Sequence, residues 1–490
     1  MANRLLIKTI QKPTVVSATG RRLNSATTPP LIAALTESHA SASPPPSSSA
    51  ILDFRTRTDD APRIFSSVST SKLIRSSLNL HLAAIEPMVD LGMWMMRSKL
   101  MEVPGIRDVV MEVVRHTFFE HFCAGESVEE TGRCVEKLWR SGLRGMLCYG
   151  LENADDNDSC DRNFQAFLHT IRSASSLPPS SVSSIVVKIT AICRISLLRK
   201  VSDFLRWEHN DPSCKLPWKR ETLPILSDSS PFYHTLERPE PLTAEEELDL
   251  ELGHERLEKL CQACLEANLP LVIDAEDTFL QPSVDYFTYS SAIKCRKDGK
   301  VVLYGTIQAY LKDAGERLHL VHSAAKKMGV PLGFKMVRGA YMSSERKLAQ
   351  ALGVESPIHD TIQDTHNCYN DCVNFLLEKI SEGCGSNLVL ATHNLESGKL
   401  AATKANELGI KRDSDQVQFA QLYGMSDALS FGLRNAGFNV SKYMPFGPID
   451  KIIPYLLRRA EENRGLLSSS ILDRQLMREE LKKRLKSAFV

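Results

Sequence analysis

One predicted helix near the C-terminus carries the side chains with the clearest chemistry. A tyrosine, two adjacent arginines and a glutamate recur at i, i+3, i+4 and i+7 and so share one helix face: Tyr455, Arg458, Arg459 and Glu462. Two neighbouring guanidinium groups bind a carboxylate through paired, charge-assisted hydrogen bonds, and a glutamate suits a cationic nitrogen. The face therefore fits a small zwitterion, such as an amino or imino acid, better than a phosphate or a sugar.

A charged stripe of this kind is also typical of a solvated helix face. The opposite side of the same helix is apolar and predicts burial against a larger body: Ile452, Ile453, Leu456, Leu457 and Ala460. The role of the charged face therefore depends on the architecture that this helix joins.

Eight short apolar runs alternate with segments of helical periodicity through most of the chain. The runs span residues 145–150, 184–192, 269–277, 301–310, 333–341, 387–394, 417–424 and 441–447. Regular alternation of strands and helices predicts a parallel sheet covered by helices, and eight units predict its closure into a (βα)8 TIM-type barrel of the α/β class.

Nearly every run ends in a polar or glycine-containing signature. In a barrel the C-terminal strand ends meet at one face, where this fold builds its chemistry. The polar side chains at these ends are Lys188, Asp274, Gln308, Lys335, Arg338, Tyr341, His393 and Tyr443. Each alone also fits a buried structural group or a surface residue, but together they predict a shared site. The helix with the double arginine follows the eighth run, so we expect it to lean over the barrel mouth.

Composition limits the classes of function. The 490 residues are 43% hydrophobic and 24% charged with a net charge of +1, so no nucleic-acid partner is expected. No apolar run reaches the roughly 18 residues of a membrane-spanning helix. The twelve cysteines are predicted to be reduced, and the pair Cys261 and Cys264 lies in a helical pattern without a second pair, so no metal site is expected.

The ends of the chain differ from the middle. Residues 1–54 are basic, rich in serine and poor in acid, which predicts a mitochondrial transit peptide and a disordered Ser/Pro-rich linker; simple disorder is the alternative. We expect an N-terminal helical region at 55–140, the barrel at 141–465 with an insertion at about 193–265, and an amphipathic helix at 466–490. That last helix either packs on the barrel or attaches peripherally to an anionic membrane.

The ordered set of motifs resembles the proline dehydrogenase family, in its mitochondrial eukaryotic form, over about residues 140–465. The motifs are the strand with Lys188, the segments 273–276, 307–310, 337–341, 392–394 and 421–425, and the closing helix with its double arginine. The resemblance implies non-covalent FAD at the barrel mouth and oxidation of L-proline to Δ1-pyrroline-5-carboxylate by hydride transfer from substrate C5 to flavin N5. It also implies that electrons pass to a membrane quinone, as the first step of proline catabolism, with peripheral association with the mitochondrial inner membrane.

The resemblance also implies roles for individual residues. The substrate-binding set is Lys188, Leu422, Tyr443, Tyr455, Arg458, Arg459 and Glu462. The cofactor-binding set is Ala275, Gln308, Arg338, Gly339, Ala340, Tyr341, Thr392, His393 and Gln421. Asp274 and Lys335 are the implied catalytic residues, with Asp274 beside Lys188. Lys335 stands where bacterial members carry an arginine near the reactive flavin nitrogen, so it keeps the charge but loses the planar fork.

Three other interpretations remain open at this point. A barrel-type Schiff-base lyase or aldolase would use Lys188 or Lys335 as its nucleophile. A non-catalytic barrel protein would have lost its cofactor. A preference for hydroxyproline over proline is the third, and the implied crowding of the substrate ring by Tyr443 counts against it. No GxGxxG loop follows any run, which argues against a Rossmann nucleotide site.

Overall fold

The computed structural model describes residues 65, 68–82, 85–296, 299–465 and 467–488. The side chains of residues 82, 86, 88, 461–472 and 488 are not part of that description. The predicted transit peptide at 1–54 therefore lies outside the described residues, and so does the side chain of Glu462.

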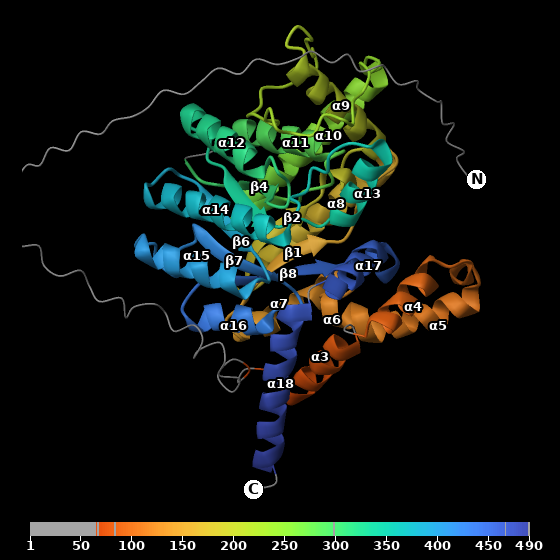
Figure 1. Cartoon of the computed structure of the whole chain (residues 1–490), viewed down its shortest axis with the longest axis vertical. Helices are drawn as coiled ribbons and strands as arrows, with labels where there is room; N and C mark the ends of the chain where they lie inside the picture. Colours follow the sequence, from red (N-terminus) through yellow and green to blue (C-terminus); the bar gives the residue numbers. More distant parts are fainter. Residues whose placement is uncertain (1–64, 66–67, 83–84, 297–298, 466, 489–490) are drawn as a thin grey trace, which may run out of the picture. The chain divides into compact units, whose positions relative to one another are not determined.

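Eight parallel strands form a closed barrel in which neighbours in sequence are neighbours in space (Figure 1). The strands are β1 Arg144–Tyr149, β2 Val182–Val187, β3 Leu271–Ile273, β4 Leu303–Gln308, β5 Gly333–Val337, β6 Asn387–Ala391, β7 Val417–Leu422 and β8 Val440–Phe446. The predicted (βα)8 barrel is confirmed. Every predicted run continues past the end of its strand, furthest after β2, β3 and β5. After β2 and β3 the reason is that buried residues continue past the strand, through the turn Ile189–Ala191 and the loop after β3.

Helices surround the barrel. They are α8 Asn157–Ser175, α9 Ile195–Asn210, α10 Ala244–Glu266, α11 Gln281–Lys294, α12 Ala314–Met328, α13 Met342–Leu352, α14 Ile362–Ser381, α15 Leu395–Glu407, α16 Asp427–Asn435 and α17 Ile449–Gly465. Side-chain hydrogen bonds cap the N-termini of several of these helices. At α10 the Thr243 hydroxyl accepts from the Glu246 N–H at 3.2 Å, and the Glu246 carboxylate accepts from the Thr243 N–H at 2.8 Å. The connection from β2 to β3 is the longest in the barrel, because a segment without regular structure separates α9 from α10.

A group of mostly short helices precedes the barrel and one long helix follows it. The first group is α3 Thr70–Leu82, α4 Glu86–Arg97, η2 Lys99–Glu102, α5 Pro104–Val114, η3 Arg115–Phe119, α6 Glu120–Phe122 and α7 Val128–Arg140. The last helix, α18 Leu467–Ala488, packs against α3 and α16 and buries Leu476 and Met477. No helix in the described part of the chain is both long and apolar enough to cross a membrane.

The buried Asp473 joins α18 to the barrel. Its carboxylate accepts hydrogen bonds from the backbone N–H groups of Asp427 at 3.2 Å and Ala428 at 3.0 Å, at the start of α16. Burial, together with the nearby charge of Asp427, raises the pKa of Asp473 to about 7. The contact therefore caps α16 with a side chain from the end of the chain.

The barrel interior is filled by side chains that alternate with those facing the helices. This inner cluster contains Met146, Cys148, Val186, Val272, Val301, Tyr304, Val389 and Ala420. Tyr304 on β4 lies beside Gly333 on β5, and a Cβ at Gly333 would overlap with the tyrosine ring. The ring thus fits inside the barrel because its neighbour has no side chain.

This packing predicts the effect of Gly333→Ala. The added methyl group would displace Tyr304, so we expect a loss of about 1–3 kcal/mol in the free energy of unfolding, measured by urea denaturation. Gly315→Ala on α12 is the matched control, because no atom lies within 4 Å of its Cβ position. The control should leave stability unchanged or raise it by up to about 1 kcal/mol. Equal losses in the two variants would contradict this account of the interior.

Candidate active site

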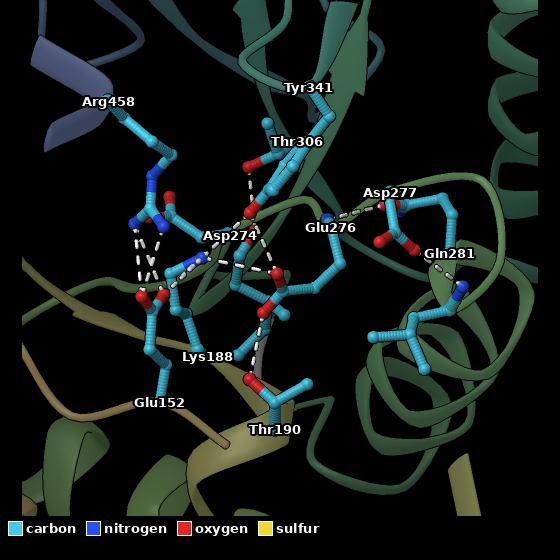
Figure 2. A network of polar contacts seen from close by, with 12 residues as sticks. Glu152, Lys188, Thr190, Asp274, Glu276, Asp277, Gln281, Thr306, Tyr341 and Arg458 are labelled. Carbon is cyan, nitrogen blue, oxygen red and sulfur yellow. Dashed lines mark hydrogen bonds and ion pairs between the residues drawn. The ribbon is translucent and has the colours of Figure 1, made fainter. Parts of the chain in front are cut away.

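The structure gathers the predicted polar residues at the C-terminal ends of the strands. Lys188 follows β2, Asp274 follows β3, Gln308 ends β4 and Lys335 lies in β5. Arg458 comes from α17 and reaches the same group of charges (Figure 2). Two sets of buried charges result, one around Lys188 and one inside the barrel rim.

Lys188 is the centre of the first set. Its Nζ lies 3.4 Å from a Glu152 carboxylate oxygen and 3.3 Å from a Glu276 carboxylate oxygen. Both terminal nitrogens of Arg458 donate to Glu152, at 3.1 Å each to Oε1 (Figure 2). Glu152 therefore bridges a cation at the end of β2 and a cation on the helix over the mouth.

Glu276 is fixed from several sides. The hydroxyl groups of Tyr341 and Thr190 donate to its carboxylate at 2.8 Å and 2.9 Å (Figure 2). Its backbone N–H donates to the Gln281 side chain at 2.8 Å, and its carbonyl accepts from the Gln308 side-chain amide at 2.7 Å. Glu276 thus holds Lys188 in one position relative to Tyr341.

These groups stay ionised despite burial. Burial raises the pKa of Glu152, but the charges of Lys188 and Arg458 outweigh it and hold the pKa below its usual value. Burial likewise lowers the pKa of Lys188, yet Glu276, Tyr341 and Glu152 raise it well above its usual value. The set around Lys188 therefore consists of charged groups that compensate one another.

Arg459, the second arginine of the pair, is also buried. Its guanidinium lies 5.1 Å above the ring of Tyr455. Tyr455 and Leu422 belong to an apolar cluster with Ile452 and Leu456, formed beneath α17. The burial of Ile452 and Leu456 agrees with the sequence pattern, but Tyr455, predicted on the charged face, joins them, and much of the cluster comes from α5, η3 and α6 before the barrel.

Asp274 and Lys335 form the second set, an ion pair inside the barrel rim. The Tyr443 hydroxyl donates to the other Asp274 oxygen at 2.7 Å and lies 2.9 Å from the sulfur of Cys148. Lys335 Nζ lies 5.0 Å from the centre of the Tyr443 ring. Burial raises the pKa of Asp274, but Lys335 and Lys188 outweigh it, and the net pKa is lowered.

The implied pairing of Asp274 with Lys188 needs correction. Lys188 contributes to the field at Asp274, but its own ion pairs are with Glu152 and Glu276. Asp274 pairs with Lys335 instead. The reason is geometric: Glu152 and Glu276 lie on either side of Lys188, while Lys335 from β5 reaches Asp274.

Arg338 stands apart from both charge sets. Its three guanidinium nitrogens donate to neutral acceptors: His366 Nδ1 at 3.0 Å, Thr392 Oγ1 at 2.8 Å and Ser397 Oγ at 2.8 Å. The guanidinium carbon of Arg338 lies 4.4 Å from the centre of the Tyr369 ring. Burial lowers the pKa of Arg338, and no described carboxylate is paired with it. A partly buried cation with only neutral partners is suited to an anionic ligand group.

Several other predicted cofactor residues adjoin Arg338 in the sequence or in space: Gly339, Ala340, Thr392 and His393. Gly339 has φ of 140°, which favours glycine, and a Cβ there would overlap with the ring of Tyr310. Burial lowers the pKa of His393 to about 3, so the ring is neutral, and its Nε2 accepts from the Leu422 N–H at 3.1 Å. Gln421 is buried, while Ala275 is half-buried and Ala340 is exposed.

Sequence reasoning missed several of these residues. Glu152 lies shortly after β1, so the rule that selected Lys188 after β2 could have found it. His366 lies in the second turn of α14 and Ser397 in the first turn of α15, where polar residues usually mark a solvated face. Nothing in their spacing distinguished them. Among the described residues, no cluster of three or more His, Cys, Asp or Glu could hold a metal ion.

The chain belongs to the proline dehydrogenase family, whose model matches residues 132–471. It is 58% identical to proline dehydrogenase 2, mitochondrial, of Arabidopsis thaliana over 87% of this chain and 90% of that protein. It is 60% identical to proline dehydrogenase 1, mitochondrial, of the same plant over 87% of this chain and 86% of that protein. Human hydroxyproline dehydrogenase is 32% identical over 86% of this chain and 92% of that protein.

A solved structure shows the same fold. Proline utilization A from Bdellovibrio bacteriovorus superposes with a TM-score of 0.57 over 88% of this chain, at 18% sequence identity. This chain spans 39% of the length of that protein. At this identity the likeness concerns the fold alone, and the fold agrees with the closed eight-stranded barrel.

The buried pair of Asp274 and Lys335 predicts strong energetic coupling. Asp274→Leu leaves Lys335 without its buried partner, so we expect a loss of about 3–5 kcal/mol in the free energy of unfolding. The double variant Asp274→Leu/Lys335→Met removes both charges and should lose less than the single variant. Guanidinium denaturation monitored by circular dichroism measures both. Additive losses, with the double variant less stable than Asp274→Leu, would show that the ion pair carries no coupling.

Proposed function

We propose that the protein is an FAD-dependent proline dehydrogenase, which oxidises L-proline to Δ1-pyrroline-5-carboxylate in the first step of proline catabolism. The observation that carries the proposal is the group of cations at the barrel mouth, Lys188, Arg458 and Arg459, above an apolar base. Membership of the family and the names of the two Arabidopsis relatives support it.

The substrate carboxylate is assigned to these cations. Arg458 is only partly exposed and already bridges to Glu152, so an incoming carboxylate joins a set of charges held in position. Charge-assisted hydrogen bonds to it are worth about 1.5–3 kcal/mol each. Leu422, Tyr443 and Tyr455 are assigned to the pyrrolidine ring, and Glu462 keeps its assignment to the substrate end of the helix.

The ring amine must be neutral before a hydride can leave C5, and Glu152 is a poor base for this step. Its pKa is held below its usual value, so it accepts a proton weakly at neutral pH. The carboxylates at the mouth therefore orient the ammonium group, and the proton passes to water. Asp274 holds Tyr443 through its hydrogen bond and so fixes the wall of the ring pocket.

FAD fits the group of residues around Arg338. The uncompensated guanidinium suits a phosphate, and Gly339 allows the positive φ and the close contact with the Tyr310 ring that place the backbone beside Arg338. Gln308, Thr392, His393 and Gln421 complete the assigned contacts, with Ala275, Ala340 and Tyr341. Bound there, FAD would supply the acceptor for the hydride that leaves substrate C5. Lys335 supplies a buried positive charge that favours the reduced, anionic form.

The electron acceptor and the location are part of the same proposal. We assign the electrons to a membrane quinone and the protein to the mitochondrion, attached peripherally to the inner membrane. The basic, serine-rich N-terminus and the mitochondrial Arabidopsis relatives support this location.

Anaerobic spectroscopy tests cofactor and substrate together. The purified protein should show flavin absorption in the visible range, and L-proline should bleach it without oxygen. Flavin bands that persist after addition of L-proline would contradict the assignment of L-proline as the substrate. A folded protein that contains no flavin and takes up no added FAD would contradict the assignment of the cofactor. Borohydride trapping of substrate on a lysine would then favour the Schiff-base alternative.

Hydroxyproline is the second candidate substrate because of the human relative. Tyr443 is held by Asp274, so it should crowd a 4-hydroxyl group and make bleaching by hydroxyproline slower than by proline. Faster bleaching by hydroxyproline would reverse the assignment.

A further inference from the structure

A cavity outside the barrel is separate from the candidate active site. It has a volume of about 630 Å³ and is lined by residues of α3, of the segment from η3 to α7, of the loop after β7, of α16 and of β8. Figure 1 shows α3, α6, α7 and α16 on the same side of the barrel. None of the described residues assigned to proline or FAD lines this cavity. Its volume falls within the roughly 300–1,000 Å³ of small-molecule sites, and we call it the outer cavity.

Basic side chains outnumber carboxylates around the outer cavity. Burial lowers the pKa of His121, which also lines it, to about 4, so this ring is neutral at neutral pH. The charged side chains of the lining therefore carry an excess of two positive charges. The cations are Lys72, Arg75, Arg115, Arg133, Lys137 and Lys442, and the carboxylates are Glu120, Glu126, Glu130 and Asp427.

Three of the six cations are already neutralised by ion pairs. Arg75 pairs with Glu120 at 2.6 Å, and the buried Lys442 pairs with Asp427 at 2.7 Å. Arg115 pairs with Glu126. These pairs use three of the four carboxylates in the lining.

The other three cations have no ion pair within the part of the chain that the structure describes. They are Lys72 on α3 and Arg133 and Lys137 on α7, all exposed. The fourth carboxylate, Glu130, instead accepts the backbone N–H of Glu126 at 2.8 Å. The positive excess of the outer cavity is therefore located on these three side chains.

The three unpaired cations face the outer cavity from two helices. Arg133 and Lys137 are separated by four residues and so share one face of α7. Lys72 Nζ lies 5.6 Å from the centre of the Tyr423 ring, and the hydroxyl of that ring interacts with the thiol of Cys134 on α7. Tyr423 thus connects the position of Lys72 with the helix that carries the other two cations.

A buried polar atom without a partner also lies at the outer cavity. His121 is 6% exposed, and its Nε2 has no hydrogen-bond partner among the described residues. Buried polar atoms in folded proteins almost always have such a partner. As a neutral ring, His121 can donate an N–H from this atom to an oxygen of a ligand.

The first turn of α3 adds to the positive potential at the outer cavity. Ser69, Ser71 and Lys72 line the cavity where this helix of thirteen residues begins, and no acidic residue lies in its first turn. The N-terminus of a helix carries a partial positive charge. It therefore acts in the same direction as the three unpaired cations.

We infer that the outer cavity is a binding site for a soluble small molecule that carries a phosphate or pyrophosphate group, held by Lys72, Arg133 and Lys137. A phosphate group carries close to two negative charges at neutral pH, which matches the positive excess of the lining. Arginine binds two phosphate oxygens at once, while lysine acts as a point charge. The inference goes beyond the proposed function and does not depend on it, because the two sites share no assigned residue.

Calorimetry with pyrophosphate tests this inference on the flavin-loaded full chain in a buffer without magnesium. The variant is Lys72→Gln/Arg133→Gln/Lys137→Gln, and it should bind pyrophosphate roughly ten-fold or more weakly than the wild type. The matched control is Arg172→Gln/Lys327→Gln/Lys411→Gln. It also removes one arginine and two lysines that are exposed and form no ion pair with any described residue, but these lie elsewhere. The control should bind as the wild type does.

Several results would overturn the inference. They are a wild type that binds no pyrophosphate below about 10 mM, a variant that binds as tightly as the wild type, or a control that loses as much as the variant. Succinate should bind more weakly than pyrophosphate, and tighter binding of succinate would replace the phosphate by a dicarboxylate.

Failure of this inference is distinguishable from failure of the proposed function. Circular dichroism and proline-dependent flavin bleaching should be unchanged in the variant, because none of its three residues is assigned to proline or FAD. If the protein takes up no flavin, the same comparison of variant and control is made without it. Only binding at the outer cavity would then depend on Lys72, Arg133 and Lys137.

Lysine acylation locates the bound anion without any substitution. The wild type is treated with acetic anhydride with and without pyrophosphate, and the acetylated lysines are quantified by mass spectrometry. Pyrophosphate should protect Lys72 and Lys137 several-fold and leave the exposed Lys327 and Lys411 unprotected. Equal protection of all four lysines, or of none, would contradict binding in the outer cavity.

Discussion

Buried charges at the mouth of the barrel must be compensated, and this constraint organises the rest of the site. Leaving one ion unpaired in such a place costs several kcal/mol. The protein meets the constraint by alternating signs from Arg458 through Glu152 and Lys188 to Glu276. The pair of Asp274 and Lys335 repeats the arrangement inside the rim. Arg338 is the exception, because its partners are all neutral, and this suits the phosphate assigned to it.

The barrel makes these contacts possible because it brings distant residues together without flexible connections. Glu152, Lys188 and Glu276 follow consecutive strands, and α17 closes the set with Arg458. Packing imposes a second constraint in the barrel interior. The ring of Tyr304 fits there only because its neighbour Gly333 has no side chain.

Much of the fold could be predicted from the sequence, since eight alternating runs specify a barrel and polar residues after the strands specify its reactive end. The ion pair of Asp274 with Lys335 could not be predicted from the sequence, because it depends on which side chains meet across the barrel interior. The hydrogen bonds of His366 and Ser397 to Arg338 were not predicted either, because polar residues at these positions of a helix are typical of a solvated face. The stripe of Ile106, Val109 and Val113 has the same period whether it is buried or exposed, so only the structure revealed its exposure.

The central claim is that the cations at the mouth hold a carboxylate, and a chemical double-mutant cycle tests it most directly. Binding of tetrahydrofuran-2-carboxylate and of its carboxamide, neither with a nitrogen in the ring to oxidise, is measured by calorimetry for the flavin-loaded wild type and Arg458→Met. The wild type should prefer the carboxylate by roughly ten-fold or more, and the variant should lose most of that preference. An equal preference in both proteins would contradict the claim.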